Sequence, residues 1–325
     1  MKILFIGGTG NISGAASRQL IEQGHQLFHL NRGQRPSLPG TNVLLADIKD
    51  LSATRAALGS HQFDVVVNWI AYRREDVERD LALFRGRTAH YVFISSASVY
   101  EKPPRSPFIT EATPLNNPYW VYSQEKIQCE DRLQQAFREE AFPMTIVRPA
   151  HTYDTIWPIV LGGAFFTYAA RIRRGDPIIV HGDGTSLWCA THSDDFARGF
   201  NGLLGHPAAI GRAFHITSHE SVTWNQIYQT MGAALEREPN VVHIPSSWLI
   251  AHEPSLKGPL WGDKAHSVIF DNTAIQTLVP GYRAQIPLHV GLKRTAAWFD
   301  ADPKRQQINP DHENLLQRCL AAWKP

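Results

Sequence analysis

The first half of the sequence alternates short apolar runs with longer amphipathic stretches, and this alternation limits the fold more than any other feature. The apolar runs are predicted as strands: Ile3–Ile6, Leu27–Leu30, Val43–Leu45, Asp64–Asn68, Tyr91–Ile94 and Thr145–Val147. The stretches between them are predicted as helices: Ser13–Gln23, Leu51–Leu58, Glu75–Phe84 and Pro118–Phe137. Continuous apolar runs are typical of strands that are covered on both faces. The sequence therefore predicts an α/β fold with a doubly wound parallel sheet.

A glycine-rich segment follows the first predicted strand and opens the first predicted helix. Its sequence is Gly7-Gly8-Thr9-Gly10-Asn11-Ile12-Ser13. Glycines let the backbone approach a diphosphate closely, and a helix N-terminus offers free N–H groups and a positive dipole end to that anion. We therefore expect a Rossmann-type site whose loop binds a dinucleotide through Gly7, Thr9, Gly10, Asn11 and Ile12. A glycine-rich structural turn is the alternative, because a glycine cluster alone is a weak signal.

The end of the second predicted strand indicates which dinucleotide is bound. An acidic residue at this position would bind the ribose diol of NAD. The sequence here is His29-Leu30-Asn31-Arg32-Gly33, which has no carboxylate. Arg32, next to Asn31, can neutralise a 2′-phosphate, so the sequence favours NADP, with NAD as the alternative. If Arg32 is only a solvated loop residue, the choice stays open.

Two further strand ends are expected to complete the cofactor site. Asp47 and Ile48 follow the third predicted strand, where Asp47 is placed to accept a hydrogen bond from the adenine amine. Residues 68–71 end the fourth predicted strand and are expected to pass under the diphosphate and the ribose, with Ala71 among the binding residues. Both predictions follow from the rule that doubly wound sheets bind ligands at the carboxyl ends of their strands.

The pattern of the sequence changes after about residue 150. Tryptophans, prolines and histidines become frequent, and the strand and helix patterns weaken. We see neither an internal repeat nor a low-complexity linker, so we expect one compact unit. Residues 1–150 are predicted to form the dinucleotide-binding portion, and residues 151–325 mainly a smaller substrate-binding cap with segments that return to the sheet.

Two candidate catalytic residues lie on the fourth predicted helix. Tyr122 and Lys126 are four residues apart and share one helix face, while Asn117 and Pro118 suit the N-cap and the first helical position. A nearby ammonium favours the phenolate, so Lys126 is expected to lower the pKa of Tyr122. Tyr122 would then move a proton to or from a substrate oxygen while a hydride moves at the nicotinamide. Taken alone, the spacing also suits an ordinary amphipathic helix.

Hydroxyl side chains end the fifth predicted strand, and Ser96 is expected to hydrogen-bond the same substrate oxygen as Tyr122. With these features in this order, the chain resembles the extended short-chain dehydrogenase/reductase family, which contains NAD-dependent sugar epimerases and dehydratases. The matching segments span roughly residues 1 to 220: Gly7-x-x-Gly10, Ser95-Ser96-Ala97-Ser98-Val99-Tyr100, Tyr122-x-x-x-Lys126 with Glu130 after it, Val147-Arg148-Pro149, and His181-Gly182-Asp183-Gly184 leading to Asp194-Asp195.

The resemblance implies roles for individual residues. Ser96, Tyr122 and Lys126 would form a catalytic triad, Lys126 would also bind the nicotinamide ribose, and Pro149 would lie beside the nicotinamide ring. The reaction would be hydride transfer at a hydroxyl or carbonyl of a sugar or sugar derivative, by oxidoreduction or epimerisation. Ala97 follows Ser96 where the dehydratases carry an acidic pair, which argues against 4,6-dehydration.

Two positions differ from the nucleotide-sugar enzymes of that family. Trp188 stands where those enzymes place an arginine for the diphosphate, and an indole cannot neutralise a diphosphate. His151 replaces the asparagine that usually precedes the tyrosine after the Arg-Pro pair. The substrate is therefore a sugar with or without a nucleotide, bordered by Ser96, Ala97, His151 and Trp188. Trp188 can stack on a sugar ring, although core packing is its alternative role.

Charge and histidine spacing limit the other functions. The chain has 32 Lys and Arg against 30 Asp and Glu, and this near balance gives no reason to expect a nucleic acid or a membrane as partner. His151, His181 and His192 match no ligand motif, so no metal is expected. Three cysteines without a paired motif favour the cytoplasm, and a homodimer is possible. The alternative function is a non-catalytic dinucleotide-sensing regulator or an RNA-associated relative, which would have no need of Ser96, Tyr122 and Lys126.

Overall fold

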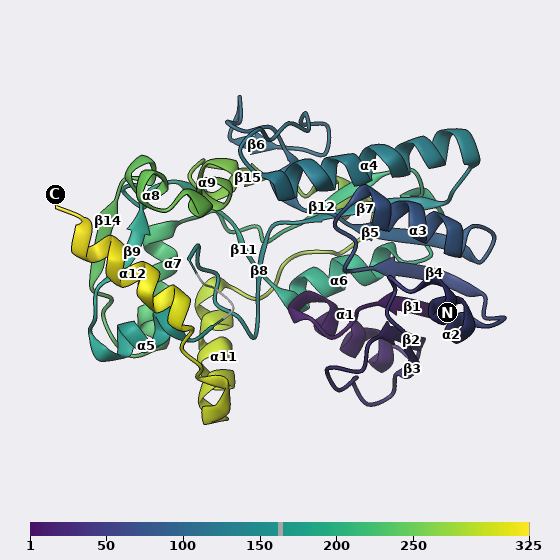
Figure 1. Ribbon diagram of the computed structural model, residues 1–325, viewed down its shortest axis with the longest axis horizontal. Helices are drawn as coiled ribbons and strands as arrows, with labels where there is room; N and C mark the ends of the chain where they lie inside the picture. The colour runs from purple at the N-terminus through teal and green to yellow at the C-terminus, as the bar shows by residue number, and fades with distance from the viewer. Residues whose placement is uncertain (162–164, 325) are drawn as a thin grey trace.

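A seven-stranded parallel sheet forms the centre of the computed structural model, which describes residues 1–161 and 165–324 (Figure 1). The strand order is β12-β7-β5-β4-β1-β2-β3. The strands are β1 (Lys2–Ile6), β2 (Gln26–Asn31), β3 (Asn42–Leu45), β4 (Phe63–Asn68), β5 (Thr88–Ile94), β7 (Met144–Pro149) and β12 (Ala213–Ile216). The predicted α/β class and all six predicted strands are confirmed. The seventh strand, β12, comes from the second half of the chain.

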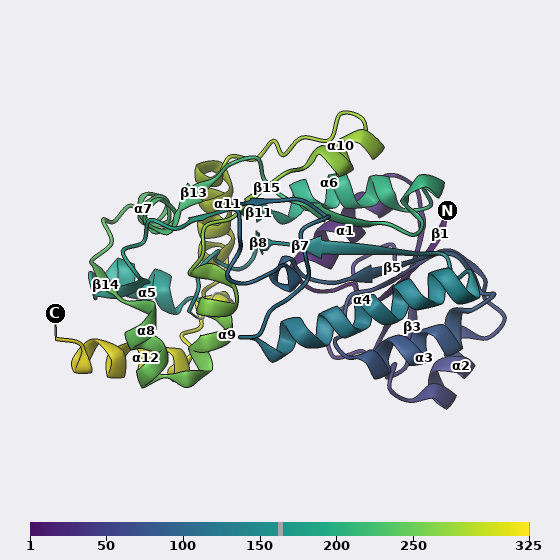
Figure 2. The ribbon, with the colours of Figure 1, turned by 90° about the horizontal axis from the view of Figure 1, so that it is seen from above.

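Helices cover both faces of this sheet (Figure 2). Helices α1 (Asn11–Glu22) and α6 (Ser193–Leu203) pack on one face, and α2 (Leu51–Leu58), α3 (Arg74–Phe84) and α4 (Val121–Glu140) pack on the other. Successive strand residues point to opposite faces. Ile3 and Phe5 of β1 accordingly join the core under α1 and α6, whereas Leu4 and Ile6 join the core under the other three helices. Burial on both faces explains the uninterrupted apolar runs of the sequence.

The start of α4 differs from the prediction. The helix begins at Val121, and Asn117 is not its N-cap. The Asn117 carboxamide is buried and already used: its nitrogen donates to the carbonyls of Ser98 (2.7 Å) and Gly262 (2.6 Å), and its oxygen accepts from the Tyr119 backbone N–H (3.2 Å). Asn117 therefore fixes a turn before the helix, and Tyr122 becomes the second helical residue.

The second half of the chain builds its own core around a parallel strand pair, β9 (Ile178–His181) and β14 (Val241–Ile244). Around this pair lie α5 (Thr167–Arg174), α7 (Trp224–Ala234), α8 (Ser246–His252), α9 (Lys257–Pro259), α11 (Leu288–Asp300) and α12 (Pro310–Ala322), while α10 (Thr273–Leu278) returns to the sheet core. Short strand pairs connect the segments: β8 (His151–Tyr153) with β11 (Ala190–His192), β10 (Leu187–Trp188) with β13 (Val222–Thr223), and β6 (Phe108–Ile109) with β15 (Ile269–Phe270).

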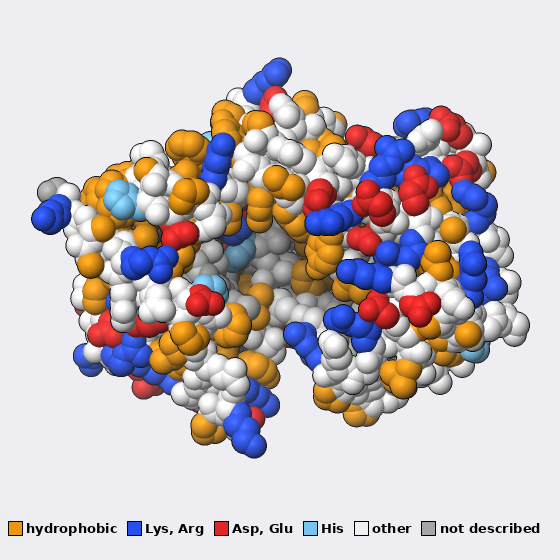
Figure 3. Space-filling model, viewed as in Figure 1, with side chains coloured by type: hydrophobic (Ala, Val, Ile, Leu, Met, Phe, Trp, Pro, Cys, Tyr) orange, Lys and Arg blue, Asp and Glu red, His pale blue; other side chains and the backbone are white. Residues whose placement is uncertain are grey.

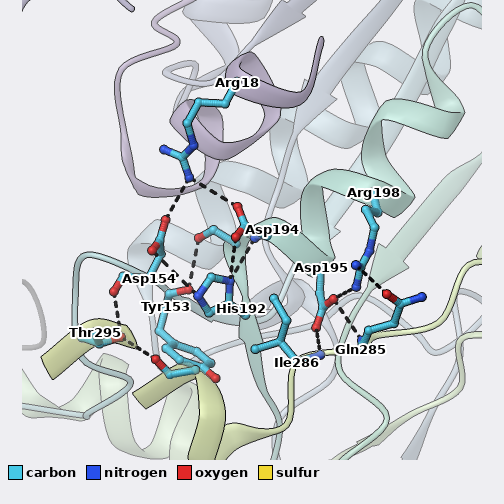
Figure 4. Close-up of polar contacts among 12 residues, drawn as sticks. Arg18, Tyr153, Asp154, His192, Asp194, Asp195, Arg198, Gln285, Ile286 and Thr295 are labelled. Atoms are coloured by element: carbon cyan, nitrogen blue, oxygen red, sulfur yellow. Dashed lines mark hydrogen bonds and ion pairs between the residues drawn. The ribbon is translucent and has the colours of Figure 1, made fainter. Parts of the chain in front are cut away.

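Polar contacts join the two halves beside α1 and α6 (Figure 4). Arg18 of α1 donates to Asp154, which follows β8, and to Asp194 of α6, both at 3.3 Å. Asp194 and Asp195 lie in the first turn of α6 and do not cap it. His192 is the N-cap, and its Nδ1 accepts from the Asp194 backbone N–H at 3.2 Å. Asp195 instead accepts from two backbone N–H groups of the segment before α11.

Candidate active site

The loop between β1 and α1 has the shape that a diphosphate needs. Gly8 has φ +97°, and a Cβ at this position would lie 2.7 Å from the His29 ring, so only glycine fits. His29 lies buried beneath the loop and hydrogen-bonds Ser17 Oγ at 3.0 Å. Burial lowers the pKa of His29 to about 4, so the ring adds no charge at neutral pH. The Gly10 N–H donates to Ser13 Oγ at 2.9 Å, which closes the loop at the helix start.

A cleft of about 1300 Å³ runs from this loop along the carboxyl ends of the strands, and Figure 3 shows it as a hollow between the two halves. This volume exceeds the roughly 300–1,000 Å³ of an ordinary ligand pocket, so an extended dinucleotide fits. Twelve of the thirteen residues that the sequence predicts for the cofactor line the cleft: Gly7, Thr9, Gly10, Asn11, Ile12, Asn31, Arg32, Asp47, Ile48, Tyr122, Lys126 and Pro149.

The remaining predicted cofactor residue, Ala71, is buried and does not line the cleft. Its carbonyl accepts a hydrogen bond from the Lys126 ammonium at 2.6 Å. Asn11 has a second task as well. Its amide donates to Ser193 Oγ (3.1 Å) and its oxygen accepts from the Thr155 N–H (3.3 Å). The start of α1 is thereby tied to the second half of the chain.

Ser96, Tyr122 and Lys126 all line the cleft. The Ser96 hydroxyl lies close enough to the Tyr122 phenol to lower its pKa. The Lys126 ammonium donates to the carbonyls of Ala71 and Ile94 (2.6 and 2.7 Å), which follow β4 and end β5, and lies 5.9 Å from the centre of the Tyr122 ring. Tyr72, which the sequence did not indicate, places its ring 4.6 Å from the same ammonium. Two strand ends therefore hold the lysine beside the tyrosine.

The expected fall in the pKa of Tyr122 does not occur in this structure. Burial raises the pKa of Tyr122 to about 12, although the nearby Ser96 hydroxyl offsets part of this shift. Burial also lowers the pKa of Lys126 to about 8, and its ammonium is occupied by two carbonyls rather than by the phenol. At neutral pH the free protein therefore holds Tyr122 as a phenol, which can donate a proton to a carbonyl oxygen.

A buried ion pair positions the segments that carry these residues. Arg148 of β7 donates through Nη2 to Glu130 of α4 at 2.6 Å, and through Nε to both carboxylate oxygens at 3.1 and 3.2 Å. The Ser95 hydroxyl donates to the same carboxylate. Glu130 lies one turn after Lys126, Ser95 precedes Ser96, and Arg148 precedes Pro149. The pair and Ser95 therefore connect α4, β7 and the end of β5, each of which contributes a residue to the site.

A second, smaller pocket of about 210 Å³ opens beside the cleft and shares Ser96, Tyr122, Pro149 and Ala150 with it. The residues predicted to contact substrate all line this pocket: Ser96, Ala97, His151 and Trp188. Trp188 is almost fully buried, and its ring stacks with that of Trp224. Trp188 is therefore both a core residue and a wall of the pocket.

Two charged residues of this pocket, Asp263 and Lys264, were missed by sequence reasoning. Asp263 and Lys264 end a π-helical turn, Leu260–Lys264, which lies far along the chain from the fourth predicted helix. Gly262 of this turn packs so closely on Trp120 that a Cβ there would lie 2.9 Å from the Trp120 Cβ. A π-helical segment is itself a signal of a functional site, but it is seen only in the folded chain.

Histidines of the predicted substrate segments lie apart from any metal-like arrangement. Within residues 1–161 and 165–324, no three His, Cys, Asp or Glu side chains are grouped to hold a metal ion. His151 and His181 both place ring edges against Trp224, with centroids 5.9 and 5.2 Å away, and His192 packs against Tyr153. Over the same described residues, none of the helices is long and apolar enough to cross a bilayer.

The sheet order, the glycine loop and the Tyr–Lys pair on α4 are those of a short-chain oxidoreductase of the extended type. Residues 3–217 match the family model of the NAD dependent epimerase/dehydratase family, which is about two thirds of the chain. The chain therefore belongs to this family of enzymes and uses a nicotinamide dinucleotide.

Two curated relatives show how diverse the similar proteins are. The chain is 24% identical over 290 residues to a 2′-dehydrokanamycin reductase of Streptomyces kanamyceticus, with 87% of this chain and 80% of the relative covered. It is 28% identical over 260 residues to chloroplast stem-loop binding protein of 41 kDa b of Arabidopsis thaliana, with 74% of this chain and 65% of that protein covered.

Solved structures share the fold. The UDP-glucose 4-epimerase of Bifidobacterium longum, in complex with NAD+ and UDP, has a TM-score of 0.75 at 16% identity, over 93% of this chain and 99% of that one. An epimerase of Methanothermobacter thermautotrophicus has a TM-score of 0.77 at 18% identity, over 93% of each chain. At these identities the likeness concerns the fold alone.

Proposed function

We propose that this enzyme interconverts a hydroxyl and a carbonyl of a small sugar or sugar derivative by hydride transfer with NADP. One observation carries the proposal: the small pocket and the dinucleotide cleft share Ser96, Tyr122 and Pro149. A substrate carbon in the small pocket can therefore lie close to the cofactor and to the phenol at the same time. Proximity and orientation of this kind supply a large part of enzymatic rate enhancement.

Each residue of the triad has a distinct role in this proposal. The bound nicotinamide supplies or accepts the hydride at the substrate carbon. In the reductive direction, Tyr122 donates its proton to the carbonyl oxygen, and Ser96 hydrogen-bonds the same oxygen. Lys126 holds the nicotinamide ribose and carries a positive charge beside the phenolate that remains. Pro149 lies beside the nicotinamide ring, and residues beyond 150 mainly bind the substrate.

The size and chemistry of the small pocket favour a substrate without a nucleotide. Its volume of about 210 Å³ lies below the roughly 300–1,000 Å³ typical of larger ligands. Trp188 occupies the position where an arginine would neutralise a diphosphate, and it is almost fully buried. A relative named for the reduction of 2′-dehydrokanamycin supports the same choice. The relative named for stem-loop binding does not favour that role here, because the net charge is only +2.

The direct test is hydride transfer with a panel of free sugars, sugar acids, their keto derivatives and the corresponding UDP-linked sugars. We expect the nicotinamide absorbance at 340 nm to change with members of the free-sugar set. We also expect a slower reaction, or none, with the UDP-linked set. Turnover of the UDP-linked sugars alone would overturn the choice of a nucleotide-free substrate. Binding of the dinucleotide without turnover of any member would favour the non-catalytic alternative.

Arg32 is expected to determine the preference for NADP. Arg32, Arg35 and Lys49 all line the cleft, and they lie close in sequence to the ends of β2 and β3. A charge-assisted hydrogen bond to a phosphate contributes roughly 1.5–3 kcal/mol. We therefore expect Arg32→Ala to weaken NADP binding about 10-fold or more and to leave the Kd for NAD unchanged, as measured by calorimetry.

Arg55 supplies the control for this variant. It is exposed on α2 and does not line the cleft. Arg55→Ala removes the same charge from the surface and should leave both affinities unchanged. Equal losses for NAD and NADP in Arg32→Ala would show that Arg32 supports the fold of the loop rather than the 2′-phosphate.

A further inference from the structure

The small pocket carries a buried ion pair whose role the proposed reaction does not explain. The Lys264 ammonium donates to Asp263 at 2.6 Å, and both residues are more than nine-tenths buried. The other Asp263 oxygen is buried and has no partner among the described residues. Both residues line the pocket together with Ser96 and Tyr122. The pair therefore lies where it can contact a substrate bound beside the phenol.

The backbone at Lys264 is held rigidly by other parts of the cap. Its carbonyl accepts from His181 Nε2 and Trp224 Nε1, both at 3.1 Å, and from Ser186 Oγ at 3.4 Å. None of these bonds depends on the lysine side chain. The backbone that carries the ammonium is therefore fixed, as is usual for substrate-binding groups. The lysine side chain can be replaced without loss of these backbone hydrogen bonds.

A second lysine, Lys102, is buried within electrostatic range of the ion pair. Lys102, which is also buried, lies close enough that Asp263 raises and Lys264 lowers its pKa, while burial is the largest cause and lowers the pKa overall. Burial, with Lys264 nearby, lowers the pKa of His151 to about 3, so this ring is neutral. Burial also lowers the pKa of His266, despite the nearby Asp263. Among the residues that the structure describes, Lys264 is thus the one ammonium that lines the pocket, while Lys102 acts on the pair from outside the lining. A buried charge without a close partner is costly.

We propose that Lys264 binds an anionic group of the substrate, so that the substrate is an acidic sugar, carrying a carboxylate or a phosphate ester, rather than a neutral one. The substrate anion would pair with the Lys264 ammonium, which lines the pocket. Its hydroxyls would meet the polar atoms of Ser98, His151 and Trp188. This inference rests on the proposed function, because it assigns the substrate class of the same site.

Binding to the enzyme saturated with NADP+ tests the inference. The probes are glucuronate, galacturonate, glucose 6-phosphate and galactose 6-phosphate, each compared with glucose or galactose, with the fluorescence of the pocket tryptophans as the signal. We expect at least one acidic probe to bind about 10-fold or more tightly than its neutral counterpart, since hydrogen bonds to charged groups are the strong ones. The carboxylate and phosphate probes distinguish the two kinds of anion.

Variants separate this role from a structural one. Lys264→Met should remove the preference for the acidic probe, and Asp263→Asn/Lys264→Met, which leaves no unpaired carboxylate, should do the same. Both should bind NADP+ as the parent does, because neither residue lines the dinucleotide cleft. The matched control is Lys257→Met, which removes an exposed lysine seven residues earlier and should keep the preference.

Equal binding of acidic and neutral probes overturns the inference, and so does a preference that survives in Lys264→Met. Failure of every acidic probe to bind also overturns it. None of these results touches the proposed hydride transfer, which is tested by absorbance changes with the whole panel of sugars and by the loss of those changes when Tyr122 is replaced.

Discussion

Tyr122→Phe is expected to lower turnover about 100- to 10,000-fold, which is the usual contribution of a positioned general acid or base. Tyr122 lines both the cleft and the small pocket, and its phenol lies near the Ser96 hydroxyl. Phenylalanine keeps the ring and its contact with Trp120, whose centroid lies 5.0 Å away. The Kd for NADP should therefore change little, and the loss should be confined to kcat, measured with whichever panel member the parent enzyme turns over.

Tyr119→Phe is the matched control for this experiment. Tyr119 lies three residues earlier, is half-buried and lines neither of the two cavities. Loss of its hydroxyl should leave kcat unchanged. Full turnover by Tyr122→Phe would exclude the catalytic role, and a loss of equal size in Tyr119→Phe would show that the turn before α4 is sensitive to any change.

The parts that could be predicted from sequence are those encoded locally. Burial of β1, β4 and β5 on both faces demands continuous apolar runs, and the tight turn at Gly8 above His29 demands glycine. Each requirement appears within a few consecutive residues. The resulting predictions of the sheet and of the strand ends hold because a parallel sheet brings its carboxyl ends together wherever the connecting helices lie.

The predicted start of α4 was wrong because a contact with a distant residue outweighs the local capping preference of Asn117. Asn117 has a good capping side chain, yet its amide donates to Ser98 and to Gly262, which lies 145 residues later. The same kind of contact explains the pKa of Tyr122. The sequence places an ammonium four residues away, but only the folded chain shows that Ala71 and Ile94 occupy it. Local spacing predicts that two groups are neighbours without showing which other groups they bind.

Asp263 and Lys264 illustrate the same limit for the substrate pocket. No motif surrounds them, and they reach the site because Gly258 and Gly262 allow their segment to pack against Trp120. Arrangements made by glycine contacts between distant segments leave no periodic pattern in either segment. For this reason the sequence indicates the class of cofactor more fully than it indicates the substrate.

Glu130→Met is expected to lower the free energy of unfolding by about 3–5 kcal/mol, the usual cost of removing one partner of a buried ion pair. Both side chains are almost fully buried, at 2% exposure for Glu130 and 6% for Arg148. Methionine fills a similar volume, so the loss arises mainly from the guanidinium left without its carboxylate and from the Ser95 hydroxyl left without its acceptor. Urea denaturation in the absence of cofactor measures the change.

A double variant shows whether the charge or the packing is responsible. Glu130→Met/Arg148→Met leaves neither charge unpaired, so it should recover most of the stability lost in the single variant, since apolar replacement of a whole buried pair is often close to neutral. Glu139→Met, at an exposed position of the same helix, should change stability by no more than about 0.5 kcal/mol. A double variant as unstable as the single one would mean that shape, rather than charge, is what Glu130 contributes. If the double variant instead folds well but turns over slowly, the pair serves chiefly to hold Ser96, Lys126 and Pro149 in position.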